Sequence, residues 1–304
     1  MKPSSQITIH PIFVFGVSHS PWVQAVVLAM AAHNTTVKLR GLPTFRYYLK
    51  HGLIMPSCLW SDGTMTADSF EIIRQFGEVK NSPFAVSEMV KSNFKELEKL
   101  FLAYALHRTG PQKRLAFIDG WSRMMDTPQT LGTISGRAFI CWYFVILIEA
   151  GRYALMKRLK NRPTDFALKI MLERFSQILG QSLFFDGDTP GPTDFGLLGQ
   201  VECMASGLTD WTMDIFKESE PLMNWLKRMH SLIEHHPTVY SRRIFQKNEW
   251  PPVNQGFPRF WFYLNFILIG LLFPLSLPAL IFAFRMRQNS AHRSGGRLFR
   301  SKQN

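Results

Sequence analysis

Two serine hydroxyl groups stand where a predicted helix begins, and this is a place where a hydroxyl can do chemistry. Ser18 and Ser20 flank His19 in the stretch SHSPWVQAVVLAM, and Pro21 follows directly. Proline is favoured at the first position of a helix, and the free amide groups there stabilise negative charge. A serine at this place is either a reactive hydroxyl or only the cap of the helix. We interpret His19 as an exposed turn residue rather than a base.

The elements around these serines form a β-α-β unit followed by a hairpin. The continuous apolar run PIFVFGV predicts a buried strand, and the alternating TTVKLRGLP predicts a second strand after the helix. Further on, SCLW and TMTA flank a Ser-Asp-Gly turn, and Asp-Gly is a strong hairpin signal. Asp68 and Ser69 then open a helix that ends near Lys80.

From residue 84 to about residue 236 the pattern is helical. The segment 138–148, AFICWYFVILI, is uncharged but too short to cross a bilayer, so it predicts a buried helix. Basic residues follow it, from Arg152 to Arg162. They form either a solvated helix face or a second membrane-facing patch.

The strongest membrane signal is the segment 260–284, FWFYLNFILIGLLFPLSLPALIFAF. It is 25 residues long and uncharged, and a helix needs about 20 apolar residues to cross a bilayer core. Trp261 and Tyr263 suit a position at the membrane interface. Pro274 and Pro278 each remove a helix hydrogen bond. The segment is therefore either a kinked single span, which we favour, or a re-entrant hairpin.

The net charge and the termini favour a lipid partner. The formal net charge is +13, and the tail 285–304 holds six basic residues and no acidic one. Because this tail directly follows the apolar run, it favours anionic lipid, and we expect no nucleic acid as a partner. The N-terminus lacks the apolar core of a secretory signal peptide. We therefore expect a cytosolic folded part that is held to a membrane near its C-terminal end.

The three cysteines, Cys58, Cys141 and Cys203, are widely spaced. They form no Cys-x-x-Cys pair and no cluster of metal ligands. We expect reduced, structural thiols and no metal site.

Three stretches make the chain resemble the glutathione S-transferase superfamily. SHSPWVQAVVLAM looks like the first helix of a thioredoxin-like lobe, and MPSCLWSDGTMTADSFEII resembles the pattern of a cis-proline, a hairpin and an acidic residue with serine. LFFDGDTPGPTDFGLLGQVECM resembles the start of the core helix in the helical lobe. Within the superfamily, the spacing is most similar to the failed-axon-connections and metaxin-like branch.

The resemblance implies an α/β thioredoxin-like N-terminal domain followed by an all-α C-terminal domain, here with a C-terminal transmembrane helix or hairpin. The expected segments are a thioredoxin-like domain at 9–80, a helical domain at 84–240, a transmembrane segment at 260–284 and a basic tail at 285–304. It also implies a possible homodimer, since members of the superfamily often pair.

The resemblance further implies a site for glutathione as co-substrate. Ser18 or Ser20 would donate a hydrogen bond to the thiolate, with Ser18 favoured for this role and Ser20 for the cap. Met55 and Pro56 would offer main-chain hydrogen bonds to the cysteinyl part. Asp68 and Ser69 would hold the γ-glutamyl end, unless they only cap their helix.

Asp194 has a structural role in the resemblance, because the family places an aspartate three residues after a serine or threonine cap. Gly191 stands at that cap position and has no side chain to accept the bond. The capping box is therefore incomplete in this chain.

Three functions follow. The first is a membrane-anchored glutathione transferase that acts on apolar electrophiles. The second is a non-catalytic adaptor tethered to a membrane, as in the metaxin-like branch. The third is a binding protein for glutathione or a lipid-like ligand.

Overall fold

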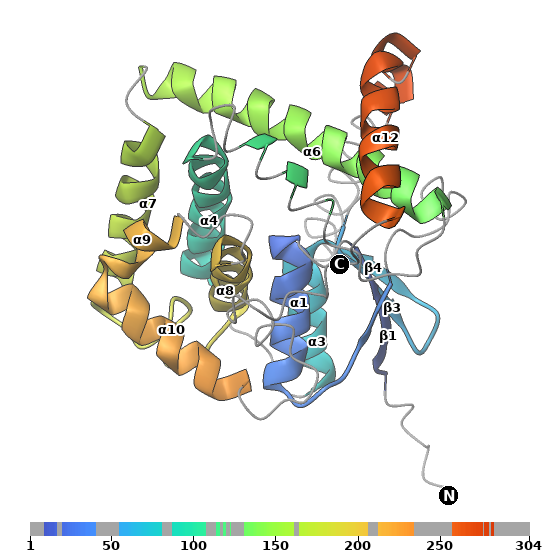
Figure 1. Cartoon of the computed structure of the whole chain (residues 1–304). Coiled ribbons are helices and arrows are strands. Elements are labelled where there is room, and N and C mark those ends of the chain that lie inside the picture. The colour runs from blue at the N-terminus through green and yellow to red at the C-terminus, as the bar shows by residue number, and fades with distance from the viewer. Residues whose placement is uncertain are drawn as a thin grey trace, which may run out of the picture.

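A computed structural model represents the chain, and it describes the greater part of the sequence. The described residues are 9–16, 20–40, 55–80, 87–107, 114–115, 118–119, 122, 131–160, 164–205, 212–233, 257–275, 277–279 and 281–282. Ser18 and His19 lie outside them, as does the basic tail. Figure 1 shows a small lobe of sheet and helix beside a larger helical lobe, with α12 projecting at one end.

The small lobe contains a four-stranded mixed sheet in the order β2-β1-β3-β4. β1 pairs with β2 in parallel and with β3 antiparallel, and β3 and β4 form the predicted hairpin. This arrangement fits a thioredoxin-like domain, and the predicted order of strands and helices is found. The elements are β1 (Pro11–Phe15), α1 (Pro21–Ala32), β2 (Lys38–Arg40), β3 (Ser57–Trp60), β4 (Met65–Ala67) and α3 (Ser69–Val79).

The helix α1 is buried along almost its whole length. Val23, Ala25, Leu28 and Met30 are each fully buried, and a helix that is apolar on all sides needs neighbours on all sides. It packs on β1 and α3 within its own lobe and on α8 of the other lobe. The apolar sequence PWVQAVVLAMAA therefore joins the two lobes.

The helical lobe is built around α8. Phe195, Leu197, Leu198 and Val201 of this helix are buried in the main core. α8 contacts α4, α9 and α10 as well as α1, which fits the predicted all-helical domain. The elements are α4 (Glu88–His107), α6 (Leu131–Arg158), α7 (Thr164–Leu179), α8 (Pro192–Ala205), α9 (Thr212–Lys217) and α10 (Glu220–Ile233).

Residues 138–148 are helical, as expected, and Ala138, Ile140, Cys141 and Tyr143 are buried, but the helix extends well beyond this segment. These residues are the middle of α6, which has 28 residues. Only 19% of its most apolar stretch is buried. The helix carries charged residues within its length: Glu149 pairs with Arg152 at 2.8 Å and with Arg114 at 3.2 Å, and Arg137 is buried. Charge on a helix face does not end a helix.

The C-terminal apolar segment is not one straight helix. α12 (Phe257–Leu271) has 15 residues, and the helical pair Arg259–Leu271 and Phe273–Ala279 is bent by 71°. By length and composition alone, α6 could cross a membrane, and so could this bent pair if it is a single span. The bend falls directly before Pro274, in keeping with the helix-breaking role of the prolines.

We predict that Gly199→Ala strongly destabilises the protein, because α8 and α1 touch through their backbones at this residue. A β-carbon at Gly199 would lie 2.2 Å from the carbonyl oxygen of Pro21 and 2.7 Å from the amide nitrogen of Ala25. We expect a loss of about 3 kcal/mol or more in the free energy of unfolding, measured by denaturant titration. Gly180→Ala is the control, since its nearest contact would be 3.4 Å. Equal stability of the two variants would contradict the prediction.

Candidate functional site

One edge of the sheet brings together the ends of three strands. Phe15 pairs with Ser57, and Ser57 pairs with Ala67, so the end of β1, the start of β3 and the end of β4 lie in line. α1 follows β1 and α3 follows β4, so both helices begin near this edge. The predicted residues at 20, 55–56 and 68–69 are thereby neighbours in space.

The Met55–Pro56 peptide bond is cis, as the resemblance implied. The amide of Asp68 donates a hydrogen bond to the carbonyl oxygen of Pro56 at 3.1 Å. Gly16 lies on the other side, where a β-carbon would come within 3.7 Å of Met55 and 2.4 Å of Val23. The bond from Asp68 fixes the start of α3 against the start of β3.

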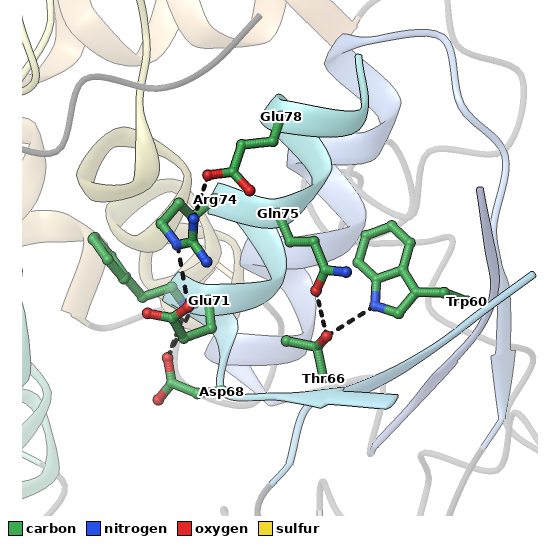
Figure 2. A network of polar contacts seen from close by, with 8 residues as sticks. Trp60, Thr66, Asp68, Glu71, Arg74, Gln75 and Glu78 are labelled. Carbon is green, nitrogen blue, oxygen red and sulfur yellow. Dashed lines mark hydrogen bonds and ion pairs between the residues drawn. The ribbon is translucent and has the colours of Figure 1, made fainter. Parts of the chain in front are cut away.

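Asp68 is the N-cap of α3. Its carboxylate oxygen Oδ1 accepts hydrogen bonds from the amides of Phe70 at 2.9 Å and Glu71 at 3.4 Å (Figure 2). Burial raises the pKa of Asp68 to about 6, against the lowering effect of these two donors. Ser69, the first residue of the helix, is 4% exposed. Asp68 therefore caps its helix, as the second interpretation expected. Its other oxygen, Oδ2, takes part in neither of these hydrogen bonds.

A polar network holds α3 on the hairpin (Figure 2). The indole Nε1 of Trp60 donates to the hydroxyl of Thr66 at 3.0 Å, and this hydroxyl donates to Gln75 of α3. On the outer face of α3, Arg74 bridges Glu71 and Glu78. These contacts position the helix start that carries Asp68.

Ser20 occupies the N-cap position of α1, and Pro21 follows it at the first helical position. Its carbonyl oxygen accepts the first helical hydrogen bond from Gln24 at 2.9 Å. Its side chain makes no capping hydrogen bond, contrary to the expected capping role, and it is 8% exposed. Ser18, the favoured partner of a thiolate, lies outside the described residues.

The edge brings together helix N-termini, a carboxylate and unpaired strand ends. Two helix N-termini contribute partial positive charge, which favours a carboxylate or thiolate, although the amides of Phe70 and Glu71 at the start of α3 already donate to Asp68. Asp68 supplies one carboxylate, which suits an ammonium group. β1 pairs with β3 from Ser57 onward, so the regular pairing of the strands stops before Met55.

Asp194 lies away from this edge and is completely buried at the start of α8. Its carboxylate accepts four N–H donors, from the amides of Phe185 at 3.0 Å, Asp186 at 3.3 Å and Gly191 at 3.0 Å and from the indole of Trp225 at 2.8 Å. Burial raises the pKa of Asp194 to about 6, and the four donors oppose that rise. The contacts are those of a structural residue that ties α8 to α10 and to the preceding loop.

Asp186 supplies the hydrogen-bond acceptor that Gly191 lacks at the cap position. The sequence alone did not indicate this role for Asp186. Its Oδ2 accepts a hydrogen bond from the amide of Thr193 at 2.7 Å, the bond that a serine at Gly191 would accept. A β-carbon at Gly191 would lie 2.4 Å from this oxygen. Burial and the charge of Asp194 raise the pKa of Asp186 to about 7. The only signal in the sequence was an aspartate five residues before a glycine cap.

The three cysteines are free and buried. Burial raises the pKa of Cys58 to about 12, which makes it a poor nucleophile at neutral pH. Within the described ranges, no group of three or more His, Cys, Asp or Glu side chains could hold a metal ion.

No protein-family profile and no curated protein matches the sequence. Solved structures that resemble the chain include Gtt2 from Saccharomyces cerevisiae, with 16% identity and a TM-score of 0.47 over 75% of this chain and 98% of that one. Glutathione S-transferase unclassified 2 from Bombyx mori has 12% identity and a TM-score of 0.47, over 79% and 99%. Poplar glutathione transferase F1 has 17% identity and a TM-score of 0.44, over 74% and 95%. At these values the likeness does not indicate what this chain binds.

We predict that Gly191→Ser and Asp186→Ala are each destabilising and that the double variant is more stable than the two single effects suggest. The serine alone collides with Asp186, and the alanine alone leaves the Thr193 amide without its acceptor. Together they restore a serine cap with Asp194 three residues on. We expect a coupling of about 1 kcal/mol or more in a double-mutant cycle of unfolding free energies. Simple additivity would contradict this account of the cap.

Proposed function

We propose that this protein binds glutathione at the sheet edge and is anchored to a membrane through its C-terminal apolar segment. The observation that carries the first part is the hydrogen bond from Asp68 to Pro56. It holds the cis Met55–Pro56 pair and the start of α3 together, where one extended tripeptide can contact both.

The polar groups match the parts of glutathione one by one. Its γ-glutamyl end has a carboxylate for the amide and hydroxyl of Ser69 at the N-terminus of α3 and an ammonium for the carboxylate of Asp68. Its cysteinyl part has a main-chain amide and carbonyl for Met55. Its thiol reaches the start of α1, where Ser18 or Ser20 donates a hydrogen bond and the helix dipole lowers the thiol pKa. A thiolate stabilised in this way attacks an apolar electrophile in a transferase.

A non-catalytic adaptor is the second candidate, and one observation favours it. The hydroxyl of Ser20 is largely covered, so the one described serine at this turn is poorly placed to meet a thiol. Thiolate chemistry then depends on Ser18 alone. An adaptor of this kind keeps the fold and the anchor without the chemistry, as the metaxin-like resemblance implies.

Calorimetry with the full chain in detergent tests these functions. We expect wild type to bind glutathione and Asp68→Asn to bind it about tenfold or more weakly, because asparagine keeps the cap but not the charge. Asp214→Asn is the matched control, since Asp214 lies in the first turn of α9.

Ser18→Ala and Ser20→Ala are compared with wild type for turnover of an aryl halide. No binding at millimolar glutathione eliminates the transferase and the glutathione binder, and binding without turnover favours a binding protein.

We further predict that the affinity for glutathione falls as the pH is lowered below about 6. The raised pKa of Asp68 means that its carboxylate gains a proton near pH 6 and loses its attraction for the ammonium group. The α-amino and α-carboxyl groups of the ligand keep their charge between pH 5 and 7, to within about a tenth of a charge. We expect about a tenfold change per pH unit below pH 6, measured by calorimetry. Asp68→Asn should remove this dependence, and an unchanged slope in that variant would contradict the assignment.

A further inference from the structure

The polar side chains of α12 are bonded to the folded body. Arg259 forms an ion pair with Asp119, and the hydroxyl of Tyr263 donates to the same carboxylate at 2.8 Å. Asn265 accepts a hydrogen bond from Ser135 of α6 at 2.8 Å. Arg259, Tyr263 and Asn265 are all of the charged, hydroxyl and amide side chains of this helix. The inner face of α12 therefore holds its hydrogen-bonding groups.

The outer face of α12 is apolar. Phe260 is 64% exposed and Leu271 is 73% exposed, and Ile267 and Leu268 between them are exposed too. Their spacing of seven, three and four residues places them on one side of a helix. A helix that faces water has the opposite arrangement, with polar groups outside. A protein partner forms about one hydrogen bond per 100–200 Å² of interface, whereas hydrocarbon needs none. This face therefore fits lipid.

The far end of α6 points to the same side of the molecule. Trp142 and Ser135 of α6 hold α12, the first through a hydrogen bond to the Phe266 carbonyl oxygen at 2.7 Å. Tyr153 follows Trp142 by about three helical turns and Ser135 by about five, so the three residues share one face of α6. Tyr153 is 71% exposed. A tyrosine with an exposed ring suits the interface of a membrane.

Positive charge surrounds Tyr153. The acidic residue of this end of α6, Glu149, is already paired with Arg152 and Arg114. Three exposed basic residues follow Tyr153, namely Lys157, Arg158 and Lys160. Lysine and arginine near a membrane surface are attracted by acidic phospholipid headgroups. The sequence left open whether these residues form a solvated face or a membrane-facing patch, and their place beside Tyr153 favours the patch.

The remaining side of α6 is used by the folded body. It packs on α4, and Leu155, Met156 and Leu159 pack against the main core. Figure 1 shows α6 along one side of the helical lobe, with α4, α8 and α10 on one side of it and α12 projecting on the other. The apolar face and the basic end are thus available together on the side that carries α12.

We propose that the molecule docks on an anionic phospholipid bilayer with the side of α6 that carries α12. The outer side chains of α12 contact hydrocarbon, while Tyr153, Lys157 and Lys160 contact the headgroups. This proposal rests on the membrane anchoring proposed above. It adds the orientation of the folded body and the class of lipid.

Charge reversal tests the headgroup contact. The full chain is diluted from detergent onto vesicles of phosphatidylcholine and phosphatidylserine, and binding is measured by flotation. We expect the double variant Lys157→Glu, Lys160→Glu to bind about tenfold or more weakly than wild type. Lys95→Glu, Lys227→Glu is the matched control, with the same change of charge at exposed positions of α4 and α10. On phosphatidylcholine alone, we expect the two double variants to bind equally.

An environment-sensitive fluorescent label tests the orientation. It is attached to a single cysteine introduced by Leu271→Cys, Tyr153→Cys or Leu183→Cys, and the natural cysteines are buried. On vesicles, we expect a large blue shift of the emission at position 271 and a smaller one at position 153. We expect no shift at position 183, an exposed leucine of the helical lobe. Circular dichroism checks that each variant is folded.

The outcomes separate the two proposals. If wild type does not float with the vesicles, the anchoring and the orientation are both wrong. If it floats but the two double variants bind equally to the acidic vesicles, or the label at position 153 behaves like that at 183, only the orientation is wrong. If Leu271→Glu halves the mass of the protein in light scattering and leaves flotation unchanged, a second copy of the chain covers α12, and the orientation is again wrong.

Discussion

The burial of one carboxylate at the start of α8 is the constraint on which the rest of the structure depends. Asp194 is fully buried and would be costly in a core of this kind without partners. Four N–H groups from the preceding loop, the cap and α10 supply them. The carboxylate therefore fixes the direction in which α8 leaves its loop, and the loop and α10 are set with it.

The position of α8 then sets the position of the candidate site. α8 approaches α1 so closely at Gly199 that no side chain fits between them. α1 in turn covers the sheet, and its start lies at the edge where β3 and α3 also begin. Through these contacts, the packing of α8 in the helical lobe fixes the position of the turn that carries Ser20. The glutathione site that we propose needs this connection, because its thiol and its γ-glutamyl end are held by different helices.

A second apolar cluster, separate from the main core, lies between α6 and α12. It buries Phe262 and stacks Trp142 on Phe266, so part of an apolar segment is used for folding. Other apolar side chains of α12, among them Ile267 and Leu271, stay exposed. Met55 packs against the same cluster, so one residue of the candidate site lies beside α6 and α12.

The sequence by itself determined the order of strands and helices in the small lobe, the hairpin at Asp62–Gly63 and the helix start at Asp68–Ser69, while it left open whether Asp68 is the cap. These depend on local patterns: continuous apolar strands, turn residues and capping residues. It also indicated the aspartate at 194. It did not predict Asp186 as the substitute cap, the extent of α6 or the docking of α12. Only the tertiary structure decided these, because each depends on contacts between residues distant in the chain, such as Ser135 with Asn265. A hydropathy profile shows where apolar residues lie in the sequence, but it does not show which of them pack inside the folded protein and which stay exposed.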